Sequence, residues 1–317
     1  MRGVIIEHMF EELEGISEAE ASAAALVALL NVKPGGLKWT EITAEVVEVG
    51  SARAVWEQHS TPQMFHLPGE PDPLSDALHS LREWRDESFR VLTITDADYP
   101  SRLRGIHQAP PILFARGEVR AEDRAVSVVG SRTASPDGLK LAAEVATVLC
   151  AEGLTVLSGL ATGIDAAGHR AALHAGGRTV AFIGSGIRRY YPAENRDLQD
   201  EIAQEGLVLS QFWPDAPPRK QHFPMRNAAM SGYGLATVVV EAGEHSGARI
   251  QARLAVEHGR PVILSDQVVQ RTQWGKSLLG RPGVYQASTA AEAVGIVEHL
   301  EQARESLDNE LQRLCAM

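Results

Sequence analysis

The chain has 317 residues, of which 44% are hydrophobic and 22% charged, a composition typical of globular proteins with a buried core. Its net charge of −11 argues against a surface coated in nucleic acid, although a local basic patch remains compatible with that charge. The two cysteines form no Cys-x-x-Cys pair, no apolar run approaches membrane-spanning length and no signal peptide is evident, so we expect a cytoplasmic protein without zinc or disulfides.

Residues 1–88 predict a small helical domain at the N-terminus. Apolar residues recur there at helical spacing and are interrupted by prolines and glycines. Helices are expected over residues 17–31, 40–49, 52–58 and 74–87, and a loop is expected around Pro62, Pro68, Pro71 and Pro73.

Two strands are expected between residues 90 and 117. Residues 90–95 alternate polar and apolar side chains, which predicts a half-buried strand. Pro110 and Pro111 come directly before the apolar run of residues 112–117. Because proline cannot donate a ladder hydrogen bond, this run is predicted to be an edge strand or a strand that begins at the prolines.

From residue 125 the chain alternates short apolar strands with helices. Strands are expected over residues 127–129, 154–158, 179–183, 208–210, 236–241 and 261–264, and helices over 138–152, 163–175, 196–205 and 248–258. This alternation predicts a parallel α/β sheet with helices on both faces, in which ligands bind beyond the carboxyl ends of the strands. Residues 298–317 predict one amphipathic helix that docks onto the body of the protein or onto another subunit.

The first strand of this series ends in Gly130-Ser131-Arg132, shortly before a helix that starts near Ser135. Backbone N–H groups point outward at such a turn, and the helix dipole adds roughly half a positive charge. The forked guanidinium of Arg132 matches the geometry of a phosphate group. We therefore predict an anion site at this turn.

Four later turns repeat the combination of a strand end, small residues and a polar group. Glycines let a backbone approach a phosphate closely, and serines donate hydrogen bonds at helix starts. Three of the five turns have an arginine nearby, so together they predict a phosphorylated ligand along one edge of the sheet. The candidate binding residues in the later turns are Ser158, Gly159, Gly163, Asp165, His169, Gly184, Gly186, Arg188, Arg189, Phe223, Arg226, Asn227, Glu241, Ser246 and Gly247.

Several of these side chains have a structural alternative. Asp165 could cap its own helix, and His169 could be a buried histidine or a contact to Asp165 or to the ligand. Arg226 could pair with Glu241, and Glu241 could anchor an arginine or helix N–H groups instead of acting in acid–base chemistry. The nearby aromatic residues, which could be core residues or could stack on bases, are Tyr190, Tyr191 and Phe223.

Four common nucleotide and catalytic patterns are absent. Gly275-Lys276-Ser277 resembles a P-loop, but Gln270 stands where that motif needs its first glycine. No Gly-x-Gly-x-x-Gly follows the first strand, and no catalytic triad or carboxylate cluster is recognisable. We therefore expect no catalytic residues, no metal site and no cofactor.

The motifs, their order and their spacing resemble the DNA-processing protein A family (DprA, also called Smf), over about residues 89–286. The matching residues are Gly130-Ser131-Arg132 with Ser135, the segments 158–169 and 184–186, Tyr191 to Asn195, Phe223 to Asn227, and Glu241 with Ser246 and Gly247. The resemblance implies an extended Rossmann-like domain over residues 89–297, after a SAM-like helical domain and before a C-terminal helix. We interpret the N-terminal domain as a packing module, with direct DNA contact as the alternative.

The resemblance also implies a function. Family members bind single-stranded DNA, load a RecA-type recombinase onto it during transformation and dimerise through the Rossmann-like domain, and no catalytic activity is established for that domain. It places Gly130, Ser131 and Arg132 in a phosphate pocket, together with the turns at 158–165 and 184–186.

This chain departs from the family pattern at several positions. Thr162 stands where the family usually has Arg, and Ala193 where it often has Lys. We expect Arg132 to carry more of the phosphate binding as a result. Further departures are Ala228, Ala229, Ala248, Ser265 and Asp266, and the basic residues that could compensate are Arg188, Arg189, Arg219, Lys220 and Arg249.

Besides DNA binding, which is the first hypothesis, two rival functions remain open. Related Rossmann-like proteins bind or hydrolyse free nucleotides, as phosphoribohydrolases do, but their Pro-Gly-Gly-x-Gly-Thr-x-x-Glu motif is absent here. The third hypothesis is a scaffold protein with a decayed pocket, which the acidic net charge and the substituted motif positions favour.

Overall fold

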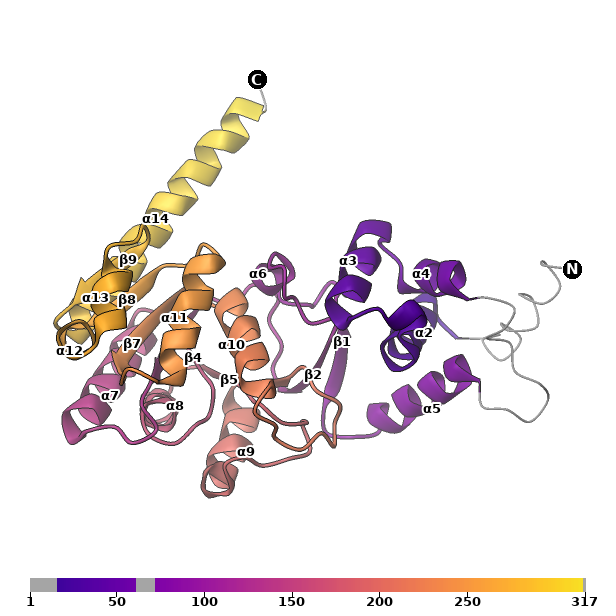
Figure 1. Ribbon diagram of the computed structural model, residues 1–317, viewed down its shortest axis with the longest axis horizontal. Helices are drawn as coiled ribbons and strands as arrows, with labels where there is room; N and C mark the ends of the chain where they lie inside the picture. Colours follow the sequence, from indigo (N-terminus) through magenta and orange to yellow (C-terminus); the bar gives the residue numbers. More distant parts are fainter. Residues whose placement is uncertain (1–15, 61–71, 316–317) are drawn as a thin grey trace, which may run out of the picture. The chain divides into compact units, whose positions relative to one another are not determined.

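The computed structural model describes residues 16–60 and 72–315, which divide into two compact units (Figure 1). Unit 1 contains the chain up to Tyr99 together with Ala109–Phe114, and unit 2 contains Pro100–Gln108 and everything from Ala115 onward. The predicted loop residues Pro62, Pro68 and Pro71 lie outside the described residues.

Unit 1 contains the four helices expected from the sequence. They are α2 (Glu18–Val32), α3 (Trp39–Val49), α4 (Ala52–His59) and α5 (Pro73–Arg85), with a 3-10 turn, η2 (Pro34–Gly36), after α2. Helix α2 is buried at every residue from Ala24 to Leu30, because α4 and α5 both pack against it. Its small alanines therefore face neighbouring helices on several sides, which explains why its sequence has no clear polar face.

The first strands follow these helices. Strand β1 (Arg90–Thr93) lies in unit 1, and β2 (Ile112–Gly117) begins there and ends in unit 2. The ring of Phe114 contacts the rings of Trp84 and Phe89 edge to face, with centroids 5.2 and 5.8 Å apart. Both predicted strands are thus present.

Unit 2 is built on parallel strands that run in the order β6-β5-β4-β3-β7-β8-β9. Their bounds are β3 (Ala125–Gly130), β4 (Thr155–Ser158), β5 (Thr179–Phe182), β6 (Leu207–Ser210), β7 (Ala236–Glu241), β8 (Val262–Ser265) and β9 (Val284–Ala287). The chain runs outward from β3 to β6 and then returns to place β7 beside β3. The strand order therefore reverses between β3 and β7.

Helices cover both faces of this sheet. The helices of unit 2 are α6 (Ser101–Arg104), α7 (Pro136–Ala151), α8 (Ile164–His174), η4 (Ala193–Asn195), α9 (Arg196–Glu205), α10 (His222–Tyr233), α11 (Gly247–Glu257), α12 (Asp266–Arg271), α13 (Gln273–Leu279) and α14 (Ala290–Cys315). Apolar residues of α7, α8 and α14 form one core with Val126, Val128 and Val238. Helices α10 and α11 pack together on the opposite face. The predicted Rossmann-like α/β class is confirmed.

Seven elements were not expected from the sequence: α6, α10, α12, α13, β9 and the 3-10 turns η2 and η4. The last helix also starts earlier than expected. Helix α14 begins at Ala290, eight positions before residue 298, and its final turns expose Leu307, Leu311 and Leu314. Among the helices of residues 16–60 and 72–315, none combines the length and the apolar character that crossing a membrane requires.

Candidate phosphate-binding site

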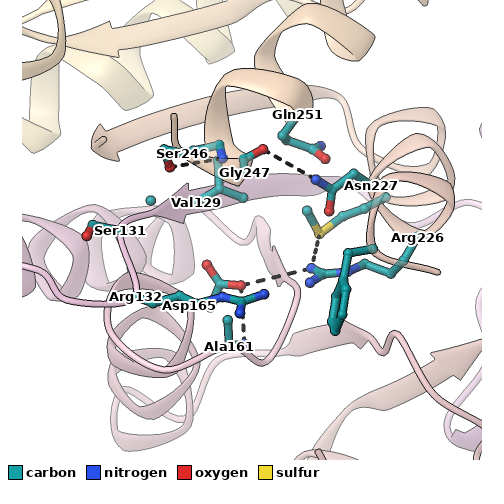
Figure 2. Close-up of a pocket in the computed structure, with 14 residues that line it drawn as sticks. Val129, Ser131, Arg132, Ala161, Asp165, Arg226, Asn227, Ser246, Gly247 and Gln251 are labelled. Atoms are coloured by element: carbon teal, nitrogen blue, oxygen red, sulfur yellow. Dashed lines mark hydrogen bonds and ion pairs between the residues drawn. The ribbon is translucent and has the colours of Figure 1, made fainter. Parts of the chain in front are cut away.

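A cavity of about 180 Å³ lies at the carboxyl ends of β3 and β7, where the strand order reverses (Figure 2). A reversal of this kind leaves a crevice, because the connections on its two sides lead away in opposite directions. We call it the switch-point cavity. It is lined by Val129, Gly130, Ser131, Arg132, Ala161, Asp165, Phe223, Arg226, Asn227, Met230, Ser246, Gly247, Ala248 and Gln251. Nine of these residues are candidates named from the sequence.

The turn at Gly130 is held by neighbouring backbone. The register between β3 and β7 shifts at this residue, and Ser131 N–H donates a hydrogen bond of 2.7 Å to the Glu241 carbonyl. A Cβ atom on residue 130 would lie 2.5 Å from Cγ1 of Ile164 and 2.7 Å from the same carbonyl. Only glycine therefore fits at this position, and the reason is packing against Ile164 and Glu241.

The start of α7 is not the open anion site that the sequence predicted. The Glu241 carboxylate accepts hydrogen bonds from Ser135 N–H, at 3.0 and 3.2 Å, and from the Ser135 hydroxyl. The Ser135 hydroxyl in turn accepts a 3.1 Å hydrogen bond from Gly138 N–H. Glu241 thus anchors helix N–H groups, which was one of its alternatives, and its charge already balances the positive end of α7.

The positive end of α11 lies at the cavity instead. Ser246 caps this helix and accepts a 3.2 Å hydrogen bond from Ala248 N–H. Ser246, Gly247 and Ala248 all line the switch-point cavity. Because no intrahelical carbonyl faces the first N–H groups of a helix, this end adds partial positive charge to the cavity.

Arg226 enters the cavity from α10 as a buried cation. Its side chain lies 4.0 Å from the Asp165 carboxylate, and its Nε atom has no partner among the described residues. Burial lowers the pKa of Arg226, and the charge of Asp165 raises it. Arg226 does not pair with Glu241, so that alternative was wrong.

Asp165 holds the turn before α8 rather than capping α8 itself. Its carboxylate accepts hydrogen bonds from Gly159 N–H at 3.2 Å and Ala161 N–H at 3.3 Å. Burial raises the pKa of Asp165, and the nearby charge of Arg226 opposes that shift. The helix-cap alternative for Asp165 was therefore wrong, because α8 begins at Ile164 and its N-cap residue, Gly163, has no side-chain cap.

Arg132 is exposed and available to a ligand. Its guanidinium lies 5.3 Å from the ring centroid of Phe223, and no hydrogen bond or ion pair joins its side chain to another residue of the described chain. With Arg226 it supplies two cations, against the single carboxylate of Asp165. The site is therefore locally positive although the chain as a whole is acidic.

A second cavity of about 440 Å³ adjoins the first and shares Arg132, Ala161, Phe223 and Arg226 with it. We call it the tyrosine cavity. Tyr191 is 40% exposed in its wall, with its ring centroid 5.8 Å from that of Phe223. The remaining lining residues are Gly159, Thr162, Gly184, Tyr190, Pro192, Ala193 and Glu194. The two family departures, Thr162 and Ala193, both lie here, so this cavity has fewer cations than the resemblance implied.

The compensating residues proposed from the sequence do not line either cavity. Arg188 pairs with the Asp215 carboxylate, and Arg189 donates a 3.2 Å hydrogen bond to the Asp215 carbonyl. Arg249 donates a 3.3 Å hydrogen bond to the Glu244 carbonyl. The side chains of Arg188, Arg189 and Arg249 are therefore engaged elsewhere, and the exposed Arg219 and Lys220 line neither cavity.

The remaining candidates lie in the supporting structure, outside both cavities. Ser158 donates a 2.6 Å hydrogen bond to the Val128 carbonyl, and Asn195 donates one of 3.0 Å to the Leu160 carbonyl. These contacts join neighbouring strand ends and turns. The predicted residues that line neither cavity are Ser135, Ser158, Gly163, His169, Gly186, Arg188, Arg189, Asn195 and Glu241.

His169 is fully buried, and its bonding fixes the proton position. The Thr179 hydroxyl donates to the Val156 carbonyl at 2.9 Å, so its oxygen accepts from His169 Nδ1, 2.6 Å away. Burial, with smaller effects of Arg226 and Arg170, lowers the pKa of His169 to about 3. The ring is neutral at neutral pH, which supports the structural alternative over a phosphate contact.

Because His169 is buried in its neutral form, we expect the free energy of unfolding to fall in mild acid. Its pKa is about 3 in the folded chain, whereas it is about 6.5 in the unfolded chain. The unfolded state therefore binds the proton first, and the stabilisation is complete above pH 6.5 and falls as the pH drops toward 3. Between pH 7 and 5 the loss should be about 2 kcal/mol. His169→Asn should remove that part of the pH dependence in urea unfolding, and an unchanged slope would contradict the assignment.

Gln251, which lines the switch-point cavity from α11, was not among the residues expected from the sequence. Ala248, Ala252 and Ala255 of this helix are buried at helical spacing, and Gln251 lies on the same face. A polar residue within a buried helical stripe was the available signal. Among the described residues, no group of three or more histidine, cysteine or carboxylate side chains could hold a metal ion.

The chain is similar to curated DNA-processing proteins. It is 36% identical to the DNA processing protein DprA of Bacillus subtilis over 185 residues, which are 58% of this chain and 62% of that protein. It is 42% identical to the DprA of Streptococcus pneumoniae over 189 residues, which are 59% of this chain and 66% of that protein. The chain thus matches less than two thirds of the length of either relative.

Solved structures are similar over more of the chain. The crystal structure of the Streptococcus pneumoniae protein superposes with a TM-score of 0.65 at 28% identity, covering 88% of this chain and 98% of that one. A Helicobacter pylori relative, described for its single-stranded DNA binding mode, gives 0.59 at 23% identity over 68% of this chain and 97% of that one. The model of DNA recombination-mediator protein A matches residues 90–299. Because this match covers more than half of the chain, the chain belongs to the DNA recombination-mediator protein A family.

Proposed function

We propose that the chain binds single-stranded DNA along the two adjoining cavities and acts as a recombination mediator. One observation carries the proposal. Arg132 and Arg226 meet at the switch point opposite a single carboxylate, and the Nε atom of the buried Arg226 has no partner among the described residues. A phosphate in the cavity would balance the positive charge that one carboxylate leaves uncompensated.

The two cavities differ in what they offer a DNA strand. Arg132, the Ser131 turn and the start of α11 surround the switch-point cavity and would hold phosphate oxygens. The exposed Tyr191 and the half-buried Phe223 offer aromatic surface in the tyrosine cavity, where bases would stack at about 1–3 kcal/mol each. Arg132 lies between them because it lines both. Phosphate and base contacts would thus follow one another along a strand.

The Arg132 contact gives a direct test. Arg132→Ala should weaken binding of an oligo-dT strand and lower the slope of log K against log salt by about 0.7, the value for one phosphate contact on single-stranded DNA. Binding is measured by fluorescence anisotropy at several salt concentrations. Arg253→Ala is the matched control, because Arg253 is an exposed arginine of α11 that pairs with Glu257 and lines neither cavity.

Two results would contradict the proposed function. The first is an absence of binding by the unaltered chain at low salt. The second is an equal loss in Arg132→Ala and Arg253→Ala, which would mean that only the overall charge matters.

We further propose that the chain loads a RecA-type recombinase, forms a homodimer and catalyses no reaction. Its membership of the family supports these three proposals.

Nucleotide hydrolysis is the less well supported alternative. Glu241 is engaged by Ser135, and Asp165 by its turn and Arg226, so neither carboxylate is available as a base. Assays of strand exchange by the recombinase, of mass in solution and of base release from nucleoside monophosphates test these three parts separately.

A further inference from the structure

Gly159, the first residue after β4, lies directly against the guanidinium of Arg226. A Cβ atom on residue 159 would lie 1.2 Å from Nη1 of Arg226, 2.2 Å from Cζ and 2.7 Å from Nη2. Two heavy atoms in favourable van der Waals contact are about 3.5–4.0 Å apart. The guanidinium therefore occupies the volume that any larger side chain at position 159 would fill.

The backbone at Gly159 does not itself require glycine. Its φ angle lies outside the left-handed region, so alanine could adopt the same conformation. Its N–H donates a 3.2 Å hydrogen bond to the Asp165 carboxylate and is therefore not available to a phosphate. From the sequence, Gly159 was expected to let a phosphate approach the backbone. In the structure, the side chain of Arg226 takes that place.

The end of the neighbouring strand, β5, receives a second side chain of α10 in a similar way. A Cβ atom on Gly184 would lie 2.9 Å from Cε1 and 3.0 Å from Cδ1 of Phe223. His222 Nδ1 donates a 3.2 Å hydrogen bond to the Gly184 carbonyl, which fixes the first turn of α10 at this strand end. Phe223 and Arg226 are three positions apart and so lie on one face of the helix. Glycines at two adjacent strand ends thus make room for the face of α10 that lines the cavities.

We propose that Gly159 is a positioning residue of the DNA site, which holds the Arg226 guanidinium at the junction of the two cavities because it has no side chain. This inference rests on the proposed function, since it takes single-stranded DNA as the ligand. Arg226 lines both cavities, and its Nη1 atom lies 4.0 Å from the Asp165 carboxylate and 3.9 Å from the Met230 sulfur (Figure 2). A methyl group at position 159 would displace the guanidinium from these contacts by rotating its flexible side chain.

Gly159→Ala tests the proposal without changing the charge of the chain. In fluorescence anisotropy this variant should bind oligo-dT about tenfold more weakly, as expected when a hydrogen-bonded charge contact is lost. The slope of log K against log salt should fall by about 0.7, the value for one phosphate contact. Gly243→Ala is the matched control, because Gly243 also follows a strand, and a Cβ atom there would have nothing within 4 Å. Its affinity should stay within about twofold of that of the unaltered chain.

A double-variant cycle shows whether Gly159 acts through the guanidinium. The methionine of Arg226→Met lacks Cζ, Nη1 and Nη2, the atoms that an added Cβ would meet. In that background, Gly159→Ala should therefore change the affinity for oligo-dT by less than about twofold, although it lowers the affinity about tenfold when Arg226 is present. A general disturbance of the turn would instead weaken binding in both backgrounds.

The outcomes separate this inference from the proposed function. If Gly159→Ala matches Gly243→Ala in affinity and salt slope, or weakens binding equally in both backgrounds, the positioning role is overturned and the proposed function stands. If the unaltered chain binds no oligo-dT at low salt, the proposed function fails as well.

Thermal unfolding covers the case in which Gly159→Ala alone does not fold. The conflict is with the guanidinium, so the double variant should then recover the melting temperature of Arg226→Met. A double variant that also fails to fold would overturn the proposal, because the alanine would conflict with something other than Arg226.

Discussion

Replacing Arg226 by methionine is expected to weaken binding of single-stranded DNA by about 10- to 150-fold, a larger effect than that of Arg132→Ala. A hydrogen bond to a charged group contributes about 1.5–3 kcal/mol, and burial at 5% exposure removes the competition from water. The Nε atom of Arg226 has no acceptor among the described residues. Because the nearest carboxylate, that of Asp165, lies 4.0 Å away, a bound phosphate would add a second counter-charge to this guanidinium.

The same substitution should also destabilise the fold, because it leaves the buried Asp165 without its counter-charge. Removing one partner of a buried ion pair typically costs about 3–5 kcal/mol. The cost here should lie at the lower end, since the two groups are 4.0 Å apart and Asp165 keeps its backbone donors Gly159 and Ala161.

A double variant separates binding from stability. Arg226→Met with Asp165→Asn removes both charges, so it should regain most of the lost unfolding free energy while DNA binding stays weak. Urea unfolding and anisotropy measure the two quantities on the same preparations. Recovery of DNA affinity in the double variant would show that Arg226 acts only through the stability of the turn, and would remove it from the binding site.

The alternation of strands and helices could be predicted because the buried parallel strands are continuous apolar runs. Val126, Val128 and Val129 of β3 are buried, and the same holds for the central residues of β7 and β8. A strand covered on both faces needs apolar side chains in both directions, so its sequence is distinct from that of the helices around it.

Helix α10 could not be predicted in this way, because Pro224 and Gly232 interrupt its pattern. Pro224 lies in the first turn, where its missing N–H has no intrahelical acceptor to lose. A Cβ atom on residue 232 would lie 2.6 Å from Cδ1 of Ile106 and 3.0 Å from Cδ1 of Leu103, so the glycine lets these side chains pack closely against α10. Helix α10 therefore tolerates Pro224 because of its place in the first turn and Gly232 because of its contacts with other parts of the folded chain.

The candidate site was predicted at the level of its turns, but the pairing within it was not. Gly130, Gly159, Gly184 and Arg132 line the cavities as the sequence predicted, whereas Gly163 and Gly186 line neither. Glu241 bonds to Ser135, and Arg226 lies beside Asp165, although spacing alone allowed Arg226 to pair with Glu241. The pairing of each carboxylate with its donor depends on how β3, β7 and α10 are arranged in space. The distance between these residues along the sequence does not reveal that arrangement.

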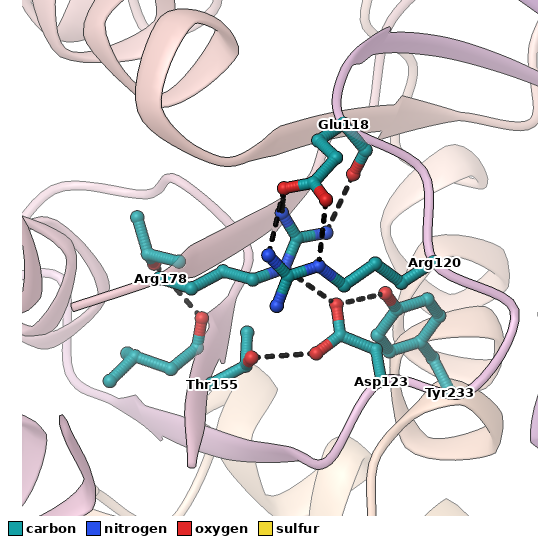
Figure 3. Close-up of polar contacts among 8 residues, drawn as sticks. Glu118, Arg120, Asp123, Thr155, Arg178 and Tyr233 are labelled. Atoms are coloured by element: carbon teal, nitrogen blue, oxygen red, sulfur yellow. Dashed lines mark hydrogen bonds and ion pairs between the residues drawn. The ribbon is translucent and has the colours of Figure 1, made fainter. Parts of the chain in front are cut away.

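A buried polar network holds the opposite end of the strands in unit 2 (Figure 3). Asp123, just before β3, accepts hydrogen bonds from Thr155 Oγ1 at 2.6 Å, Arg178 Nε at 2.9 Å and Tyr233 Oη at 2.8 Å. These donors come from the start of β4, from the residue before β5 and from the end of α10. Burial and the neighbouring Asp123 carboxylate hold the pKa of Tyr233 well above its usual value, so its hydroxyl remains a donor.

Replacing Asp123 by alanine should therefore lower the unfolding free energy by about 3–5 kcal/mol, because it leaves the Arg178 guanidinium, 9% exposed, without its buried partner. Tyr233→Phe removes a single neutral donor to the same carboxylate and should cost only about 1–2 kcal/mol. Glu257→Ala, which breaks an exposed pair with Arg253 on α11, should change stability by less than about 0.5 kcal/mol.

Urea unfolding of the three variants tests this ranking. Folded Asp123→Ala should keep its DNA affinity, since Asp123 lies before the start of β3 and the switch-point cavity lies at the carboxyl end of that strand. A loss of stability below about 1 kcal/mol would mean that the Glu118 contacts, which Arg178 makes through its other nitrogens, already balance the guanidinium. A loss of DNA affinity in fully folded protein would instead mean that the two ends of the sheet are coupled, because no Asp123 contact reaches the arginines of the site.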